Sequence, residues 1–89
     1  MITDIPPRLE AAAALAATHW DPHTCSIGDL LDRVALPVGR PDAVDLWDAV
    51  VTHLGDELTV PWELRPGRTR AEVAAMLHAA AARAAGMPR

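Results

Sequence analysis

Four side chains that could take part in chemistry lie close together in the first third of the chain: His19, Asp21, His23 and Cys25. Imidazole, carboxylate and thiolate groups all bind metal ions, so this cluster is a candidate metal site. Its spacing, H-x-D-x-H-x-C, matches none of the common zinc modules, and a further ligand would have to come from distant His53 or His78. We therefore predict a polar loop with a half-buried cysteine and no metal.

Cys25 is also a candidate nucleophile, because His23 lies close enough in sequence to act as a base. A reactive cysteine needs nearby positive charge, and only the start of the following helix offers any. The chain has no glycine-rich phosphate loop, no paired catalytic carboxylates and no Ser/His/Asp arrangement. We predict that the protein is not an enzyme.

Arg65, Arg68 and Arg70 form a local group of cations. Such a group can bind phosphate, but arginines near helix ends more often stay in solvent or hydrogen-bond to free carbonyl groups. The chain as a whole opposes nucleic-acid binding, because 12 acidic residues outnumber 8 basic residues and the net charge is −4. We predict solvated or capping arginines and no nucleic-acid partner.

The composition favours helices over strands. Hydrophobic residues make up 51% of the 89 positions, aromatic residues only 3%, and alanine is the commonest residue. Alanine is the strongest helix former, whereas strands are enriched in β-branched and aromatic residues. A chain of this length forms one modest core. We predict a single all-α domain over residues 1–89.

The chain lacks the features of a secreted or membrane protein. Its first residues are acidic and interrupted by Pro6 and Pro7, unlike a signal peptide. Its single cysteine cannot form an intrachain disulfide, which suits a reducing compartment. Charged residues interrupt the alanine-rich C-terminal segment, so no window is apolar enough to cross a bilayer. We predict a cytoplasmic protein with no membrane partner.

Start and stop signals divide the chain into helices. The candidate N-caps are Asp4, Ser26, Asp42 and Thr69, and the last three are followed at the third position by an acid. Proline and glycine near residues 37, 55 and 66 mark the ends. The predicted helices cover residues 6–19, 27–36, 43 to 54 or 58, 59–64 and 70–85.

The predicted helices have apolar stripes at helical spacing. In the first helix the stripe is Leu9, Ala12, Ala13, Ala16 and Trp20. In the helix that begins at residue 43 it is Val44, Trp47, Val50, Val51, Leu54 and Leu58. The opposite face of that helix is predicted to be exposed and acidic, with no cation among its members, which are Asp42, Asp45, Asp48, Asp56 and Glu57.

The order of these signals resembles that of the acyl and peptidyl carrier proteins. The fold that this resemblance implies is a first helix, a long loop, a second helix beginning at an Asp-Ser-Leu motif, a short third helix after an apolar-Pro pair, and a threonine-capped fourth helix. The matching residues are Gly39, Asp42-Ala43-Val44, Val60-Pro61 and Thr69. The resemblance implies a four-helix bundle of acyl-carrier-protein type, with residues 27–36 as an extra short helix in the first long loop.

The attachment position is where the chain departs from the family. In carriers the motif serine receives a 4′-phosphopantetheine arm through a phosphodiester, and the thiol of the arm carries the acyl or aminoacyl group. Ala43 has no oxygen for this ester, so the chain as written carries no cofactor, and a serine at position 43 would imply phosphopantetheine. A natural loss and a deliberate serine-to-alanine substitution both explain this. Ser26 is an alternative attachment site, but Pro37 would then cut the second helix short.

The resemblance also implies partners, because carriers are recognised through their second helix. The exposed acids Asp45, Asp48, Asp56 and Glu57 would attract enzymes with basic docking surfaces. Such an enzyme would be an acyltransferase, a ketosynthase, an adenylating enzyme or a phosphopantetheinyl transferase of a fatty-acid, polyketide or nonribosomal-peptide pathway. The alternative is a small helical protein-protein interaction module that uses the acidic face or self-association and carries no cofactor. An acidic face that serves solubility alone has the same sequence pattern.

Overall fold

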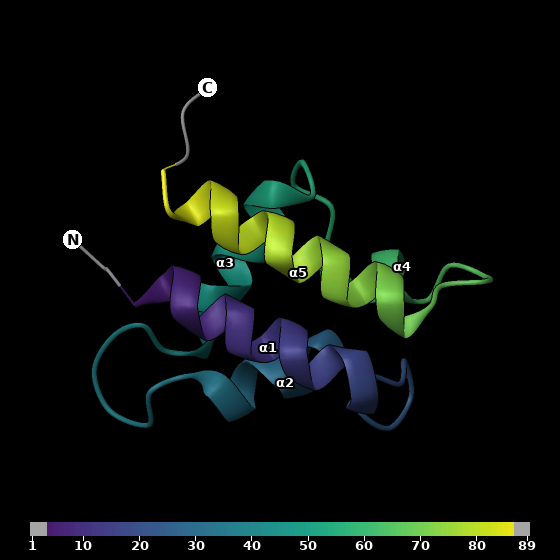
Figure 1. Ribbon diagram of the computed structural model, residues 1–89, viewed down its shortest axis with the longest axis horizontal. Coiled ribbons are helices and arrows are strands. Elements are labelled where there is room, and N and C mark those ends of the chain that lie inside the picture. The colour runs from purple at the N-terminus through teal and green to yellow at the C-terminus, as the bar shows by residue number, and fades with distance from the viewer. Residues whose placement is uncertain (1–3, 87–89) are drawn as a thin grey trace.

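The computed structural model describes residues 4–86, which form five helices. They are α1 (Ile5–His19), α2 (Ile27–Val34), α3 (Ala43–His53), α4 (Thr59–Glu63) and α5 (Arg70–Ala84). The long helices α1 and α5 run antiparallel side by side and cover α2, α3 and α4, which lie behind them in Figure 1. No strand occurs between residues 4 and 86, so the prediction of an all-α fold is confirmed.

Local hydrogen bonds fix where three of the helices begin. The side chain of each N-cap accepts a hydrogen bond from the third amide of the helix, and the third carboxylate accepts one from the cap amide. These capping boxes pair Ser26 with Asp29, Asp42 with Asp45, and Thr69 with Glu72. Asp4 is the N-cap residue of α1, as predicted, but its side chain makes no capping hydrogen bond.

Two helices end before the limits suggested by the sequence. α2 stops at Val34, whose carbonyl accepts a hydrogen bond from Nη1 of Arg8 at 2.6 Å, and does not continue to residue 36. α3 stops at His53 and does not reach residue 58. Gly55 follows with a φ of +72°, a left-handed conformation that ends a helix at little cost for glycine.

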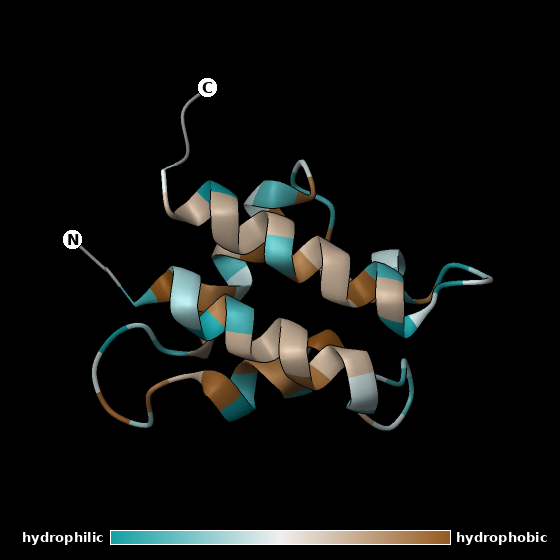
Figure 2. Cartoon of the chain, in the orientation of Figure 1, coloured by the Kyte–Doolittle hydropathy of each residue, from teal (hydrophilic) through white to brown (hydrophobic). Residues whose placement is uncertain are grey.

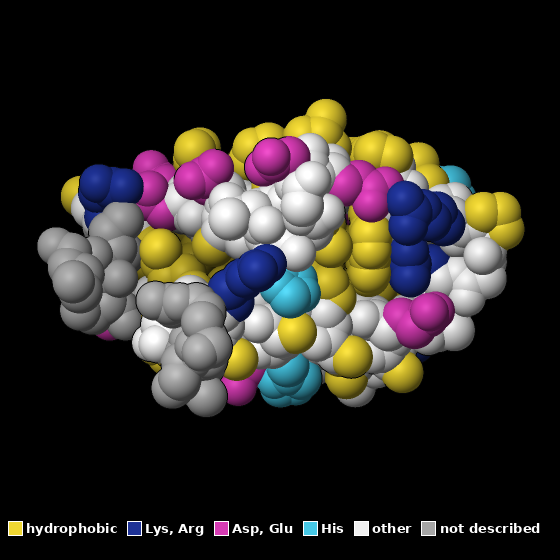
Figure 3. All heavy atoms as spheres, turned by 90° about the horizontal axis from the view of Figure 1, so that it is seen from above, with side chains coloured by type: hydrophobic (Ala, Val, Ile, Leu, Met, Phe, Trp, Pro, Cys, Tyr) yellow, Lys and Arg dark blue, Asp and Glu magenta, His cyan; other side chains and the backbone are white. Residues whose placement is uncertain are grey.

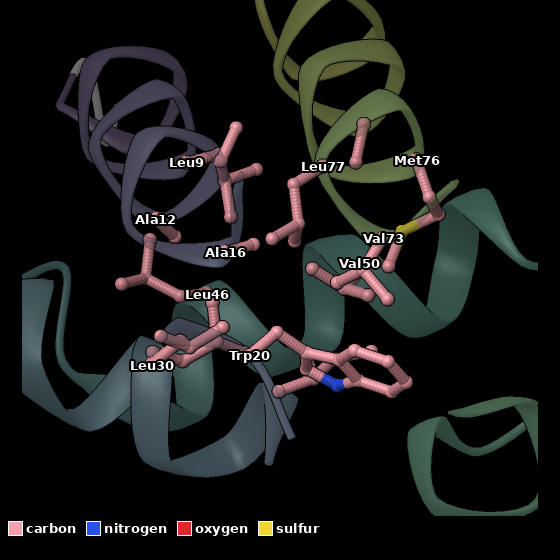
Figure 4. Close-up of a cluster of buried hydrophobic side chains, with 14 of the residues drawn as sticks. Leu9, Ala12, Ala16, Trp20, Leu30, Leu46, Val50, Val73, Met76 and Leu77 are labelled. Atoms are coloured by element: carbon pink, nitrogen blue, oxygen red, sulfur yellow. The ribbon is translucent and has the colours of Figure 1, made fainter. Parts of the chain in front are cut away.

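Buried side chains from α1, α2, α3 and α5 form one core (Figure 4). The predicted stripe of α1 lies inside it, since Leu9, Ala12, Ala13, Ala16 and Trp20 are all buried. Small alanine side chains let the α1 and α5 backbones approach closely, and these two helices share the most extensive contact in the fold. In Figure 2 the pale tan of alanine covers much of both helices, whereas stronger brown lies on α2 and the loop after it.

The predicted inner face of α3 needs correction. The fully buried side chains are Leu46 and Val50, whereas Val44 is 69% exposed and Trp47 is 37% exposed. Leu58, beyond the end of the helix, is also exposed. The apolar arc of α3 is wider than the neighbouring helices cover, so one edge of the arc stays at the surface.

One carboxyl side chain lies inside the protein. Glu63, the last residue of α4, is 2% exposed, and its Oε1 accepts hydrogen bonds from the indole Nε1 of Trp20 and the backbone amide of Ile27, both at 2.9 Å. These two donors lie just after α1 and at the start of α2. α4 has five residues and is too short to be a stable helix alone. Glu63 therefore ties three segments of the chain together.

Replacing Glu63 by leucine is expected to lower the free energy of unfolding by about 2–4 kcal/mol, because two buried donors lose their acceptor. Glu63→Gln keeps an oxygen at this position and is expected to lose less than half as much. Glu10→Leu, an exposed glutamate on α1, serves as the control and should change stability by less than about 1 kcal/mol. Urea denaturation followed by tryptophan fluorescence measures all three. Equal losses for the leucine and glutamine variants of Glu63 would contradict the role assigned to its oxygen.

Candidate functional site

The residues that match the carrier motif lie at the surface where α3 begins. Asp42 is the N-cap, Ala43 the first helical residue and Val44 the second. Oδ1 of Asp42 accepts from the Asp45 amide at 2.9 Å, and Oδ2 of Asp45 accepts from the Asp42 amide at 3.1 Å. Ala43 is partly exposed, so its methyl group is not packed inside the core. A side chain at this position is reachable from solvent.

The chain reaches this helix start through a closed loop. The Leu36 amide donates to the Pro41 carbonyl at 3.0 Å, and Pro41 is buried, so both ends of the intervening segment are fixed. Arg40, within the loop, donates from Nε and Nη2 to the two oxygens of Asp45, at 3.0 and 2.5 Å. A bidentate pair of this kind is geometrically specific. The first turn of α3 is therefore held in one orientation.

The ion pair with Arg40 lowers the pKa of Asp45 and leaves its charge matched by a cation. The guanidinium hydrogen bond, followed by the bond from the Asp42 amide, lowers the pKa of Asp45 from 3.8 to about 2. The Asp45 side chain is 14% exposed, and its charge is already matched by a cation. Of the four acids predicted to bind partners, Asp45 is thus the least available to a second protein.

A hollow of about 320 Å³ opens beside Ala43, between the starts of α2 and α3, and we name it the α2–α3 hollow. Its lining residues are Ser26, Gly28, Asp29, Leu31, Asp32, Ala43, Val44 and Trp47. Trp47 belongs to the apolar stripe predicted for α3, but it is 37% exposed and forms part of this surface. The excess width of the α3 apolar arc is the sequence signal for this, because an arc that neighbouring helices cannot cover leaves apolar side chains exposed.

The other three predicted partner-binding acids, Asp48, Asp56 and Glu57, are not all free of cations as expected. Asp48 and Asp56 are exposed. Glu57 is paired with Arg65, whose Nη2 lies 2.5 Å from its Oε2. The prediction that no cation lies among these acids is therefore wrong, because Arg40, before α3, pairs with Asp45, and Arg65, between α4 and α5, pairs with Glu57.

The arginines near residue 68 are engaged within the protein. Arg65 pairs with Glu57, the Arg68 guanidinium stacks on the Trp62 ring, and Nε of Arg70 donates to the Trp20 carbonyl at 2.9 Å. Figure 3 shows a group of basic side chains beside acidic ones at the end of the molecule where the loop between α4 and α5 lies. These contacts favour a structural role for the group over phosphate binding.

The histidine and cysteine cluster forms a tight turn. Oδ1 of Asp21 accepts from the backbone amides of His23 and Thr24, at 2.8 and 3.0 Å, and these bonds lower the pKa of Asp21. The backbones of Asp21 and Cys25 are paired by two further hydrogen bonds, and Cys25 is 8% exposed, more buried than predicted. Within residues 4–86, no group of three His, Cys, Asp or Glu side chains is arranged to hold a metal ion.

Comparison of the chain with protein-family models, with curated proteins and with solved structures finds no match. Among the helices in residues 4–86, none combines the length and apolar character needed to cross a membrane.

Arg40→Gln is expected to raise the pKa of Asp45 from about 2 back toward 3.8, because the largest cause of the shift is removed. The folded-state pKa is the lower one, so Asp45 contributes stability above pH 3.8 that is lost as the pH falls through about 2. Carboxyl-carbon NMR titration measures the pKa directly. Arg33→Gln, at an exposed position on α2, removes the same charge and should leave Asp45 unchanged; a similar shift in both variants would contradict a specific pair.

Proposed function

We propose that this chain is an acyl- or peptidyl-carrier-like domain of a fatty-acid, polyketide or nonribosomal-peptide pathway that, as written, does not carry phosphopantetheine. The observation that carries the proposal is the position of Ala43. It is the first residue of α3, directly after a capped and clamped N-terminus, and it lies at the surface. A carrier needs its attachment residue in such a place, because a second protein must reach it.

The order of the helices supports the same proposal. A long helix is followed by a long connection, a helix that begins at Asp42, a one-turn helix that includes Val60-Pro61, and a final helix capped by Thr69. α2 is the extra short helix in the first connection. This order agrees with the order that the resemblance implies, except that Val60-Pro61 lies within α4 and not before it.

Residue 43 does not fit the phosphopantetheine arm. A phosphodiester needs a hydroxyl oxygen, and alanine has none. Ser26 has a hydroxyl group, but its Oγ accepts from the Asp29 amide as the N-cap of α2. The function proposed for the chain as written is therefore recognition by enzymes with basic docking surfaces, among them an acyltransferase, a ketosynthase, an adenylating enzyme or a phosphopantetheinyl transferase.

A second candidate function, a small helical interaction module that never carried a cofactor, is favoured by the exposure of Val44 and Trp47. Large apolar side chains grouped on the surface of a small protein are typical of binding sites. A serine at position 43 distinguishes the two functions. A carrier-like domain would accept the phosphopantetheine arm there, whereas an unrelated helical module would not.

Ala43→Ser is expected to gain one phosphopantetheine group when incubated with coenzyme A and a broad-specificity phosphopantetheinyl transferase. Intact-mass spectrometry measures the gain. The unchanged chain tests Ser26 as the acceptor, and Ala75→Ser, an exposed alanine of α5, is the matched control; neither should gain mass. If Ala43→Ser stays unmodified while a known carrier is modified in the same mixture, the carrier proposal is wrong and the interaction module remains.

A further inference from the structure

The α2–α3 hollow combines an aromatic surface with carboxylates. Trp47 and Val44 are both exposed, and Asp29 and Asp32 lie on the α2 side. None of its eight lining residues is a cation. An aromatic face attracts a cation, and carboxylates beside it supply hydrogen-bond acceptors. The chemistry of this surface therefore favours a positively charged group with an apolar stem.

The protein already contains this combination with a cation in place. The guanidinium carbon of Arg68 lies 3.7 Å from the centroid of the Trp62 ring, and Nη1 lies 3.5 Å from Oε2 of Glu72. The Arg68 side chain is only 13% exposed, so it is well covered by these contacts. Among residues 4–86, no arginine stacks on Trp47 in the same way. The hollow thus combines a tryptophan with carboxylates, as at Trp62 and Glu72, but it has no arginine like Arg68 among its lining residues.

We propose that the α2–α3 hollow docks an arginine side chain of a partner protein. The guanidinium would stack on Trp47 and hydrogen-bond to Asp32 and to the second oxygen of Asp29, whose Oδ2 already accepts from the Ser26 amide. Arginine suits the site better than lysine, because its planar group both stacks on an indole and binds carboxylates through two N–H groups. The net charge of −4 favours the approach of a basic surface.

The size of the hollow agrees with a protein side chain as its occupant. Its volume of about 320 Å³ is at the lower end of the range for sites that enclose a small molecule. Its edge at Val44 is open to solvent, so a side chain can enter from a surface that lies against α2 and α3. The proposal goes beyond the carrier function and does not depend on it, because position 43 needs no modification for the hollow to bind.

The test is an amide NMR titration of the unmodified chain with the peptide acetyl-Ala-Leu-Arg-Ala-Leu-Arg-amide. The comparison peptide has citrulline, which has nearly the same shape without the charge, in place of both arginines. The arginine peptide is expected to shift the signals of residues 26–32 and 43–47 and of the Trp47 indole. It should bind at least about fivefold more tightly than the citrulline peptide, from the sizes of exposed cation–aromatic and ion-pair interactions.

Matched variants separate the site from general charge. Asp32→Asn and Trp47→Ala are each expected to weaken binding about fivefold, and Trp47→Phe should retain most of it. Asp4→Asn removes the same charge from an exposed residue that makes no side-chain capping bond and does not line the hollow, and it should change binding less than twofold. Asp29 is left unchanged because it belongs to the capping box of α2.

Several results would overturn the proposal. Equal binding of both peptides would mean an apolar groove, and equal effects of Asp32→Asn and Asp4→Asn would mean long-range attraction alone. A concentration-dependent dimer that alters the same signals would make a second copy of the chain the occupant, and an absence of shifts would mean that no arginine docks. None of these results bears on the mass gain of Ala43→Ser, so failure of one proposal is distinguishable from failure of the other.

Discussion

The hydrogen bonds to the buried Glu63 carboxyl group connect the segments on which the rest of the structure depends. Its Oε1 holds the Trp20 indole after α1 and the Ile27 amide at the start of α2, and both donors are buried with it. The start of α2 is one side of the α2–α3 hollow. Through its Oε1 atom, Glu63 of α4 thus helps to position the start of α2, which forms one side of the α2–α3 hollow.

The other half of the site depends on charged groups at the start of α3. Asp42 and Asp45 satisfy each other's backbone amides, and Arg40 pairs with the Asp45 carboxylate. These bonds fix the first turn of α3 around position 43, and Arg40 pairs the Asp45 charge with a cation. The exposed acids that make no ion pair within residues 4–86 include Asp29 and Asp32 on the α2 side and Asp42, Asp48 and Asp56 at and beyond α3.

The features that were predictable from sequence are those set by neighbours along the chain. The Ser26, Asp42 and Thr69 caps depend on residues three positions away, so they could be recognised directly. Glu63 bonds to Trp20 and Ile27, which precede it in the sequence by 43 and 36 positions, so no local pattern indicates these bonds. The exposure of Trp47 was unpredictable for a related reason. Helical spacing defines an apolar arc, but the neighbouring helices decide how much of that arc is buried. The surface position of Ala43 was predictable, whereas the hollow beside it was not.

The carrier-like function and the interaction module differ at position 43, but both use the surface around it. A covalent carrier function requires an oxygen at that position, which alanine lacks. Val44 and Trp47 are exposed beside position 43, and exposed apolar side chains grouped on a small protein are typical of binding surfaces. Recognition by a carrier-like domain and recognition by an interaction module would both use this exposed surface, so the two proposals differ only in whether position 43 once carried an arm.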